Sequence, residues 1–74
     1  MSVVVFAKKY GALWLTEIRR DAEGKIVRAY VQNGAYRWNR SDYPDWEFDR
    51  EVQVPSPVPG KDYNEVIEWA RKQP

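Results

Sequence analysis

The sequence predicts a small α+β domain, in which an antiparallel β-meander of about five strands carries one short C-terminal helix packed on one face. Short runs of alternating apolar and polar residues are separated by turn-forming glycine, asparagine and aspartate, a pattern typical of antiparallel strands. The final residues instead repeat apolar side chains at helical spacing. With 74 residues, the chain has room for a single domain that spans 1–74.

The first two strands are expected at residues 3–9 and 13–19. The first is rich in β-branched valine and ends at Tyr10-Gly11. The second, with the sequence LWLTEIR, alternates well enough to be half buried. The stretch from Asp21 to Gly24 then fits a type I turn followed by a glycine in the left-handed region, with the Asp21 side chain bonded to the backbone.

The third and fourth strands are expected at residues 25–32 and 35–39, joined by the tight turn Asn33-Gly34. A polar loop follows, and residues 46–54 form the most regular strand of the chain, with acidic residues alternating against apolar ones. The proline-rich segment 55–60 cannot continue a sheet ladder, because its prolines lack an N–H group. We therefore expect it to be an extended crossover.

A helix is expected at about residues 63–72. Asp62 is a suitable N-cap, and Glu65 three residues later completes a capping-box pattern. The apolar residues repeat at helical spacing and form one stripe, which consists of Tyr63, Val66, Ile67 and Ala70.

The two hairpin turns set the expected registers, with Val31 opposite both Tyr36 and Leu15. A helix about 15 Å long can cover only one face of the resulting sheet, and a one-residue slip in either hairpin would exchange the two faces. The face expected under the helix holds Leu13, Leu15, Val27, Ala29, Val31, Tyr36 and Trp38. The opposite face holds Trp14, Thr16, Ile18, Ile26, Arg28, Tyr30 and Arg37.

The composition excludes several kinds of site. Cysteine and histidine are absent, which rules out a disulfide framework, a zinc site with these ligands and a Ser-His triad. No glycine-rich phosphate loop is present. We therefore expect a protein that is not an enzyme and needs no cofactor or metal. The apolar run at residues 3–7 is too short to span a membrane, so we expect a cytoplasmic protein without membrane contact.

The face predicted to lie opposite the helix is the candidate binding surface, and its hypothesised binding residues are Trp14, Ile18, Arg28, Tyr30 and Arg37. Tryptophan, tyrosine and arginine are enriched at binding hot spots, and an uncovered apolar cluster marks an interface. The sequence therefore indicates a small module that acts through protein–protein interaction. Such a module would be an adaptor or inhibitor, of a class that phages and mobile elements often encode.

A first alternative assigns the same face to nucleic acid, because arginine and tyrosine side chains can contact phosphates and stack on bases. Residues 1–40 hold eight Lys/Arg against three Asp/Glu, a net charge of +5, whereas residues 41–74 hold four against eight, a net of −4. Consecutive strands usually pair. We therefore expect the acidic strand 46–54 to lie beside strand 35–39 and to neutralise Arg37, which weakens this alternative.

A second alternative is a homodimer, formed through the sheet faces or through an edge strand at residues 3–9, in which the candidate face has a purely structural role. The face would also be structural if the sheet curled like a half-closed barrel, so that Trp14, Ile18 and Tyr30 filled a second small core.

Overall fold

The computed structural model describes residues 1–34 and 36–74. The elements in this part of the chain are β1 Ser2–Ala7, β2 Gly11–Arg20, β3 Ile26–Val31, β4 Arg37–Asn39, the 3₁₀ turn η1 Arg40–Asp42, β5 Phe48–Val54 and α1 Tyr63–Arg71. The predicted α+β fold, a five-stranded antiparallel sheet with one C-terminal helix, is confirmed. No helix in the described residues is long and apolar enough to cross a membrane.

The strands form one sheet in the order β4-β3-β2-β1-β5. β1 to β4 follow one another as a meander, but β5 joins the far edge, where Val52 lies opposite Val4 of β1. The predictions that the acidic strand lies beside the fourth strand, and that the first strand is an edge, are therefore wrong. The valines at positions 3–5 are all buried. Such a continuous apolar run is typical of a central strand that is covered on both faces.

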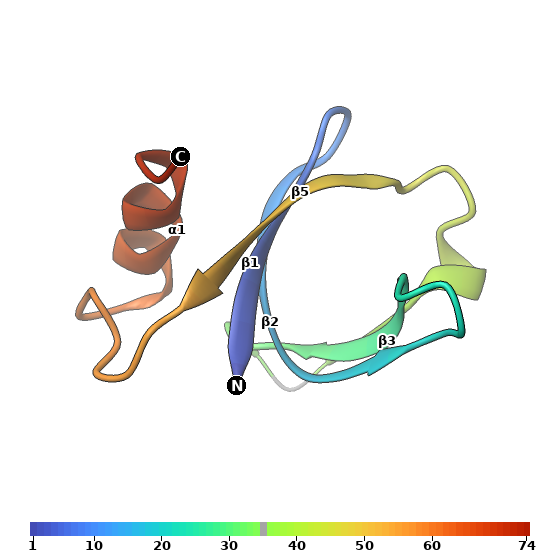
Figure 1. Ribbon diagram of the computed structural model, residues 1–74, viewed down its shortest axis with the longest axis horizontal. Helices are drawn as coiled ribbons and strands as arrows, with labels where there is room; N and C mark the ends of the chain where they lie inside the picture. Colours follow the sequence, from blue (N-terminus) through green and yellow to red (C-terminus); the bar gives the residue numbers. More distant parts are fainter. Residues whose placement is uncertain (35) are drawn as a thin grey trace.

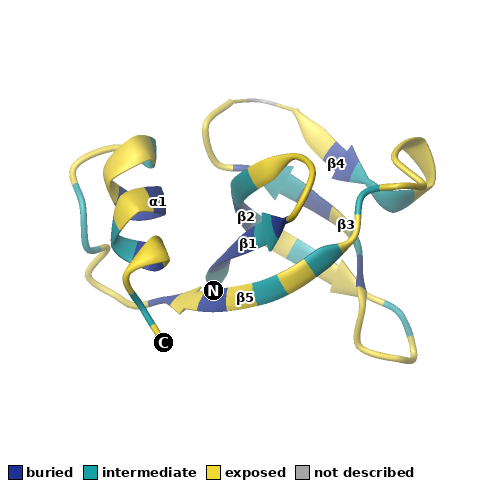
Figure 2. Cartoon of the chain, turned by 90° about the horizontal axis from the view of Figure 1, so that it is seen from above, coloured by how far each residue is buried: buried dark blue, intermediate teal, exposed yellow. Residues whose placement is uncertain are grey.

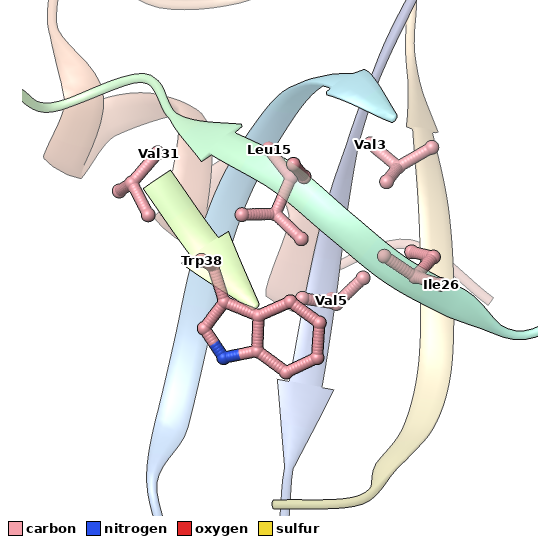
Figure 3. Packing of buried hydrophobic residues seen from close by; sticks show 7 residues of the cluster. Val3, Val5, Leu15, Ile26, Val31 and Trp38 are labelled. Atoms are coloured by element: carbon pink, nitrogen blue, oxygen red, sulfur yellow. The ribbon is translucent and has the colours of Figure 1, made fainter. Parts of the chain in front are cut away.

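The sheet curls so that β3 and β5 face each other across an enclosed space, while α1 lies outside the curl (Figure 1). Two separate cores result, one inside the curl and one beneath the helix. The inner core consists of Val3, Val5, Leu15, Ile26, Ala29, Val31 and Trp38, most of which Figure 3 shows converging from several strands. The outer core consists of Val4, Trp14, Val52, Val54, Val66, Ile67 and Ala70.

The helix covers the opposite face of the sheet from the one predicted. Its buried stripe packs against Trp14 and against valines of β1 and β5. The face of Leu15 and Trp38 needs no helix, because curling brings its side chains together on the inside. The alternative of a half-closed barrel correctly predicted that the sheet curls. It placed the wrong residues inside, because the curl encloses the face of Leu15, and Trp14 packs beneath the helix.

The registers set by the hairpin turns agree with the prediction in the middle of the sheet. Leu15 lies opposite Val31 across β2 and β3, and Tyr30 lies opposite Arg37 across β3 and β4. The predicted first residue of the fourth strand, Ala35, and its expected pairing lie outside the described residues.

A bulge in β2 changes the register beyond that point. Glu17 adopts a left-handed backbone conformation with φ of +51°. As a result Arg19, rather than Ile18, lies opposite Arg28, and Ile18 packs against the inner core. A second shift beside Arg19 places Ile26 in the inner core as well. The prediction that Ile18 and Ile26 share the face of Trp14 is therefore wrong.

The predicted chemistry of the β2–β3 turn is confirmed. The Asp21 carboxylate Oδ1 accepts hydrogen bonds from the backbone N–H groups of Glu23 and Lys25, each at 2.9 Å. Gly24 has a φ of +85°, which glycine adopts without strain.

The predicted helix cap is also present. Asp62 Oδ1 accepts from the N–H of Glu65 at 3.0 Å, and Glu65 Oε1 accepts from the N–H of Lys61 at 3.0 Å. The stripe of the helix is buried as expected, apart from the half-buried Tyr63.

We predict that Trp14→Ala lowers the free energy of unfolding by about 3–5 kcal/mol, because it empties a buried site beneath the helix. Tyr30→Ala should cost less than about 1 kcal/mol, because Tyr30 lies on the outside of the curl. Urea denaturation measures both, with Trp14→Leu as a milder variant if the alanine variant does not fold. Equal losses at the two positions would contradict this placement of the two rings.

A second prediction concerns the left-handed residue of the bulge. Glu17→Gly should raise the free energy of unfolding by up to about 1 kcal/mol, because glycine adopts a positive φ without steric cost. Glu17→Val should lower it by about 1–2 kcal/mol, since a β-branched residue is poorly tolerated there. Thr16→Gly is the control and should be destabilising, because Thr16 pairs regularly within the strand. The same sign for both Glu17 variants would refute the bulge geometry.

Candidate binding surfaces

The five residues hypothesised to share one binding surface lie in three different environments. Trp14 lies beneath α1, and Ile18 packs against the inner core. Arg28, Tyr30 and Arg37 lie together on the outside of β3 and β4, as predicted. Figure 2 shows that β1, which lies between β2 and β5, is largely buried, whereas exposed residues alternate with buried or intermediate ones along β5.

Trp14 is a hydrogen-bonded core residue. Its side chain is 8% exposed, and its indole Nε1–H donates to Ser2 Oγ at 2.9 Å. Its backbone N–H donates to the hydroxyl oxygen of Tyr63 at 3.1 Å. Burial raises the pKa of the Tyr63 hydroxyl above its ordinary 10.0. The expectation that Trp14 is uncovered is wrong, because α1 seats its stripe over this ring.

The three remaining residues gain a fourth member, Arg19, which lies directly opposite Arg28. We call Arg19, Arg28, Tyr30 and Arg37 the outer arginine patch. They line a shallow hollow of about 330 Å³ together with Glu17, Ala29 and the partly buried Ile18. The three arginines are exposed, and the Arg37 guanidinium lies 4.8 Å from the centre of the Tyr30 ring while donating to its hydroxyl.

The acidic strand does not neutralise this patch. β5 lies at the opposite edge of the sheet from β4, so its carboxylates do not face Arg37 across the ladder. No arginine of the patch forms a salt bridge within the described residues. The bridges there are Arg20–Glu51 at 2.8 Å, Arg40–Asp21 at 3.2 Å and Arg71–Glu68 at 3.4 Å.

A second surface lies where the curl remains open, between the β2–β3 turn and the start of β5. We call Tyr10, Tyr43, Pro44, Trp46 and Phe48 the aromatic groove. The centroid of the Trp46 ring lies 4.6 Å from that of Tyr10, which stacks on it, and 5.1 Å from that of Tyr43, which meets it edge-on. Pro44, Trp46 and Phe48 line a hollow of about 760 Å³, and Tyr10 and Phe48 line a second hollow of about 400 Å³.

The floor of the groove joins it to the inner core. Trp38 is only 1% exposed, and its ring centroid lies 4.9 Å from that of Phe48. The indole Nε1–H groups of Trp38 and Trp46 are buried and have no hydrogen-bond acceptor in the described residues.

The walls of the groove carry charges of both signs. Asp45 and Glu47 come from the approach to β5, whereas Lys9 and Lys25 come from the two turns that face it. The Arg40–Asp21 salt bridge fastens the 3₁₀ turn to the β2–β3 turn beside the groove. Such a surface can hold an apolar segment and orient it by charge.

The sequence contained a signal for the groove that alternation patterns miss. Tyr10 lies in a turn, and Tyr43 and Trp46 lie in the connection before β5. Aromatic rings placed in otherwise polar connecting segments are worth noting, because binding residues concentrate in loops positioned by a rigid scaffold.

Comparison with known proteins yields no match: no protein-family model, no curated protein and no solved structure matches the chain. Within the described residues, no three acidic side chains converge on a position that could hold a metal ion. The outer arginine patch and the aromatic groove expose guanidinium groups and aromatic rings, which are side chains suited to binding.

Asp21, which pairs with Arg40, gives the stability of the protein a predictable pH dependence. Hydrogen bonds, above all from the N–H of Lys25, hold the pKa of its carboxyl below the ordinary 3.8. A group with a lowered pKa contributes stability above its unfolded pKa and loses it as pH falls through the folded value. We predict that wild type has a higher urea midpoint than Asp21→Ala at pH 6 and that this gap shrinks as pH falls below about 4. A gap that is constant down to pH 2 would contradict the lowered pKa.

Proposed function

We propose that the protein is a non-enzymatic binding module that captures an extended segment of a partner protein in the aromatic groove. One observation carries the proposal: Tyr10 and Tyr43 remain 47% and 39% exposed although both contact Trp46 in a domain that has little core to spare. Exposed aromatic clusters of this kind mark interaction sites.

The spacing of the rings suits an extended chain. Tyr10 and Tyr43 flank Trp46, and each centroid lies within 5.1 Å of it. Extended and polyproline segments rise by about 3.1–3.4 Å per residue, so one or two residues would span each separation between neighbouring rings. Grooves lined by aromatic rings recognise such segments because little conformational entropy is lost on binding.

The charges along the walls support an adaptor or inhibitor that recognises a particular partner. Asp45 and Glu47 line the larger hollow together with Lys9 and Lys25. Charges at the rim of an interface contribute little affinity, but they fix orientation and suppress wrong partners. We therefore assign the protein-binding role to the groove and not to Trp14, which the helix covers.

The test is a pull-down with nuclease-treated lysate, comparing wild type with Tyr10→Ala/Tyr43→Ala. Both side chains are exposed, so the double variant should keep its circular dichroism spectrum. We expect captured proteins to be lost with the double variant, because both exposed rings that contact Trp46 are removed. The matched control is Tyr30→Ala/Tyr36→Ala, which removes two tyrosines elsewhere and should leave capture unchanged.

The captured partner is then narrowed to overlapping peptides, which are titrated into ¹⁵N-labelled protein. The indole N–H signals of Trp38 and Trp46 should shift, because both residues line the larger hollow of the groove. Capture that is unaffected by the groove variant would refute the proposal. So would peptides that shift signals only outside the groove, or a concentration-dependent dimer whose contacts occupy the groove in the absence of any partner.

A further inference from the structure

We propose that the outer arginine patch is a separate binding site for single-stranded nucleic acid, in which the arginines contact phosphates and a base stacks on Tyr30 and Arg37. This inference does not rest on the protein-binding role of the groove. The patch lies on the outside of β2, β3 and β4, whereas the groove lies at the open end of the curl.

The pairing of Arg19 with Arg28 is the first observation that points to an anion. These residues lie directly opposite each other across β2 and β3. Like charges in this position destabilise a sheet, and no salt bridge in the described residues relieves either one. Folding gains nothing from this pair, but a phosphate that contacts both guanidinium groups would turn the repulsion into attraction.

The contact between Arg37 and Tyr30 is the second observation. The Arg37 guanidinium lies over the Tyr30 ring, 4.8 Å from its centroid, and donates a hydrogen bond to its hydroxyl. The contact holds a flat cationic group and an aromatic ring in a fixed arrangement at the surface. Bases of single strands stack on aromatic rings and on guanidinium planes, which gives affinity without a strict sequence preference.

The size of the patch favours a single strand over a duplex. The hollow has a volume of about 330 Å³, and the whole chain has a formal net charge of only +1. A duplex binder needs a broad basic footprint and an element that enters a groove. Glu17 borders the same hollow and repels phosphate on that side, which confines the backbone to the side of the arginines.

The experiment measures fluorescence anisotropy of 5′-labelled dT₁₂ with the full chain at 50 mM and 200 mM salt. If three phosphates are neutralised, the logarithm of the binding constant should fall with the logarithm of salt with a slope of about −2, which weakens binding about 20-fold across this range. Tyr30→Leu should weaken binding about 10-fold at fixed salt by removing the stacking surface.

The double variant Arg19→Gln/Arg28→Gln should reduce the slope to about −0.7, because one phosphate contact remains. Its urea midpoint should equal or exceed that of wild type, since the repelling pair is gone. The control Lys61→Gln/Lys72→Gln removes the same charge from exposed positions around the helix and should leave the slope unchanged. The groove variant Tyr10→Ala/Tyr43→Ala should also bind dT₁₂ normally, which separates this test from that of the groove.

Three results would overturn the inference. The first is no binding at 50 mM salt, or binding that the arginine variant leaves unchanged. The second is equal binding of a blunt 12-base-pair duplex. The third is full competition by polyglutamate together with normal binding by Tyr30→Leu, which would show that the patch takes any polyanion, an acidic protein segment included, without reading a base.

Discussion

The packing of Trp38 against Phe48 holds the two ends of the curled sheet together, and the rest of the molecule depends on this closure. Trp38 belongs to β4 at one edge of the sheet, whereas Phe48 opens β5 at the other edge. Their rings meet inside, among residues of the inner core. Aromatic rings bury a large area for their number, which suits a chain with so few residues. The curl leaves only its convex side for the helix, and its incomplete closure leaves the aromatic groove.

Local chemistry was predictable because its causes lie within a few residues. The Asp21 turn, the left-handed Gly24 and the Asp62 cap each follow from a side chain that satisfies nearby backbone groups. Alternation also predicted correctly that Ala29, Val31 and Trp38 share a face. Alternation alone does not reveal what covers a face, however. Here one face is covered by the sheet itself and the other by the helix, and the sequence pattern is the same in either case.

Two further features lay beyond sequence reasoning for physical reasons. The pairing of β5 with β1 is a contact between distant segments, and a preference for consecutive strands pointed to the wrong edge. The bulge at Glu17 is not marked by a glycine, so nothing in the residue type announced it. As a result, the five residues predicted to share one binding surface lie in different environments in the structure. The arginines remain exposed on the outer face, where the helix covers Trp14, and Ile18 packs against the inner core instead. The exposed rings of Tyr10 and Tyr43 contact Trp46.

The pairing of β1 with β5 also bears on how the chain is made. Among the strands of this sheet, β1 is synthesised first and β5 last, yet Val4 of β1 pairs with Val52 of β5. Until β5 arrives, the most apolar strand of the protein presents an open edge of unpaired backbone groups. Such an edge is a template for joining other chains. A ribosome-bound chain, or one cut before β5, would therefore be prone to aggregate through β1. The edge is paired only when β5 has joined the sheet.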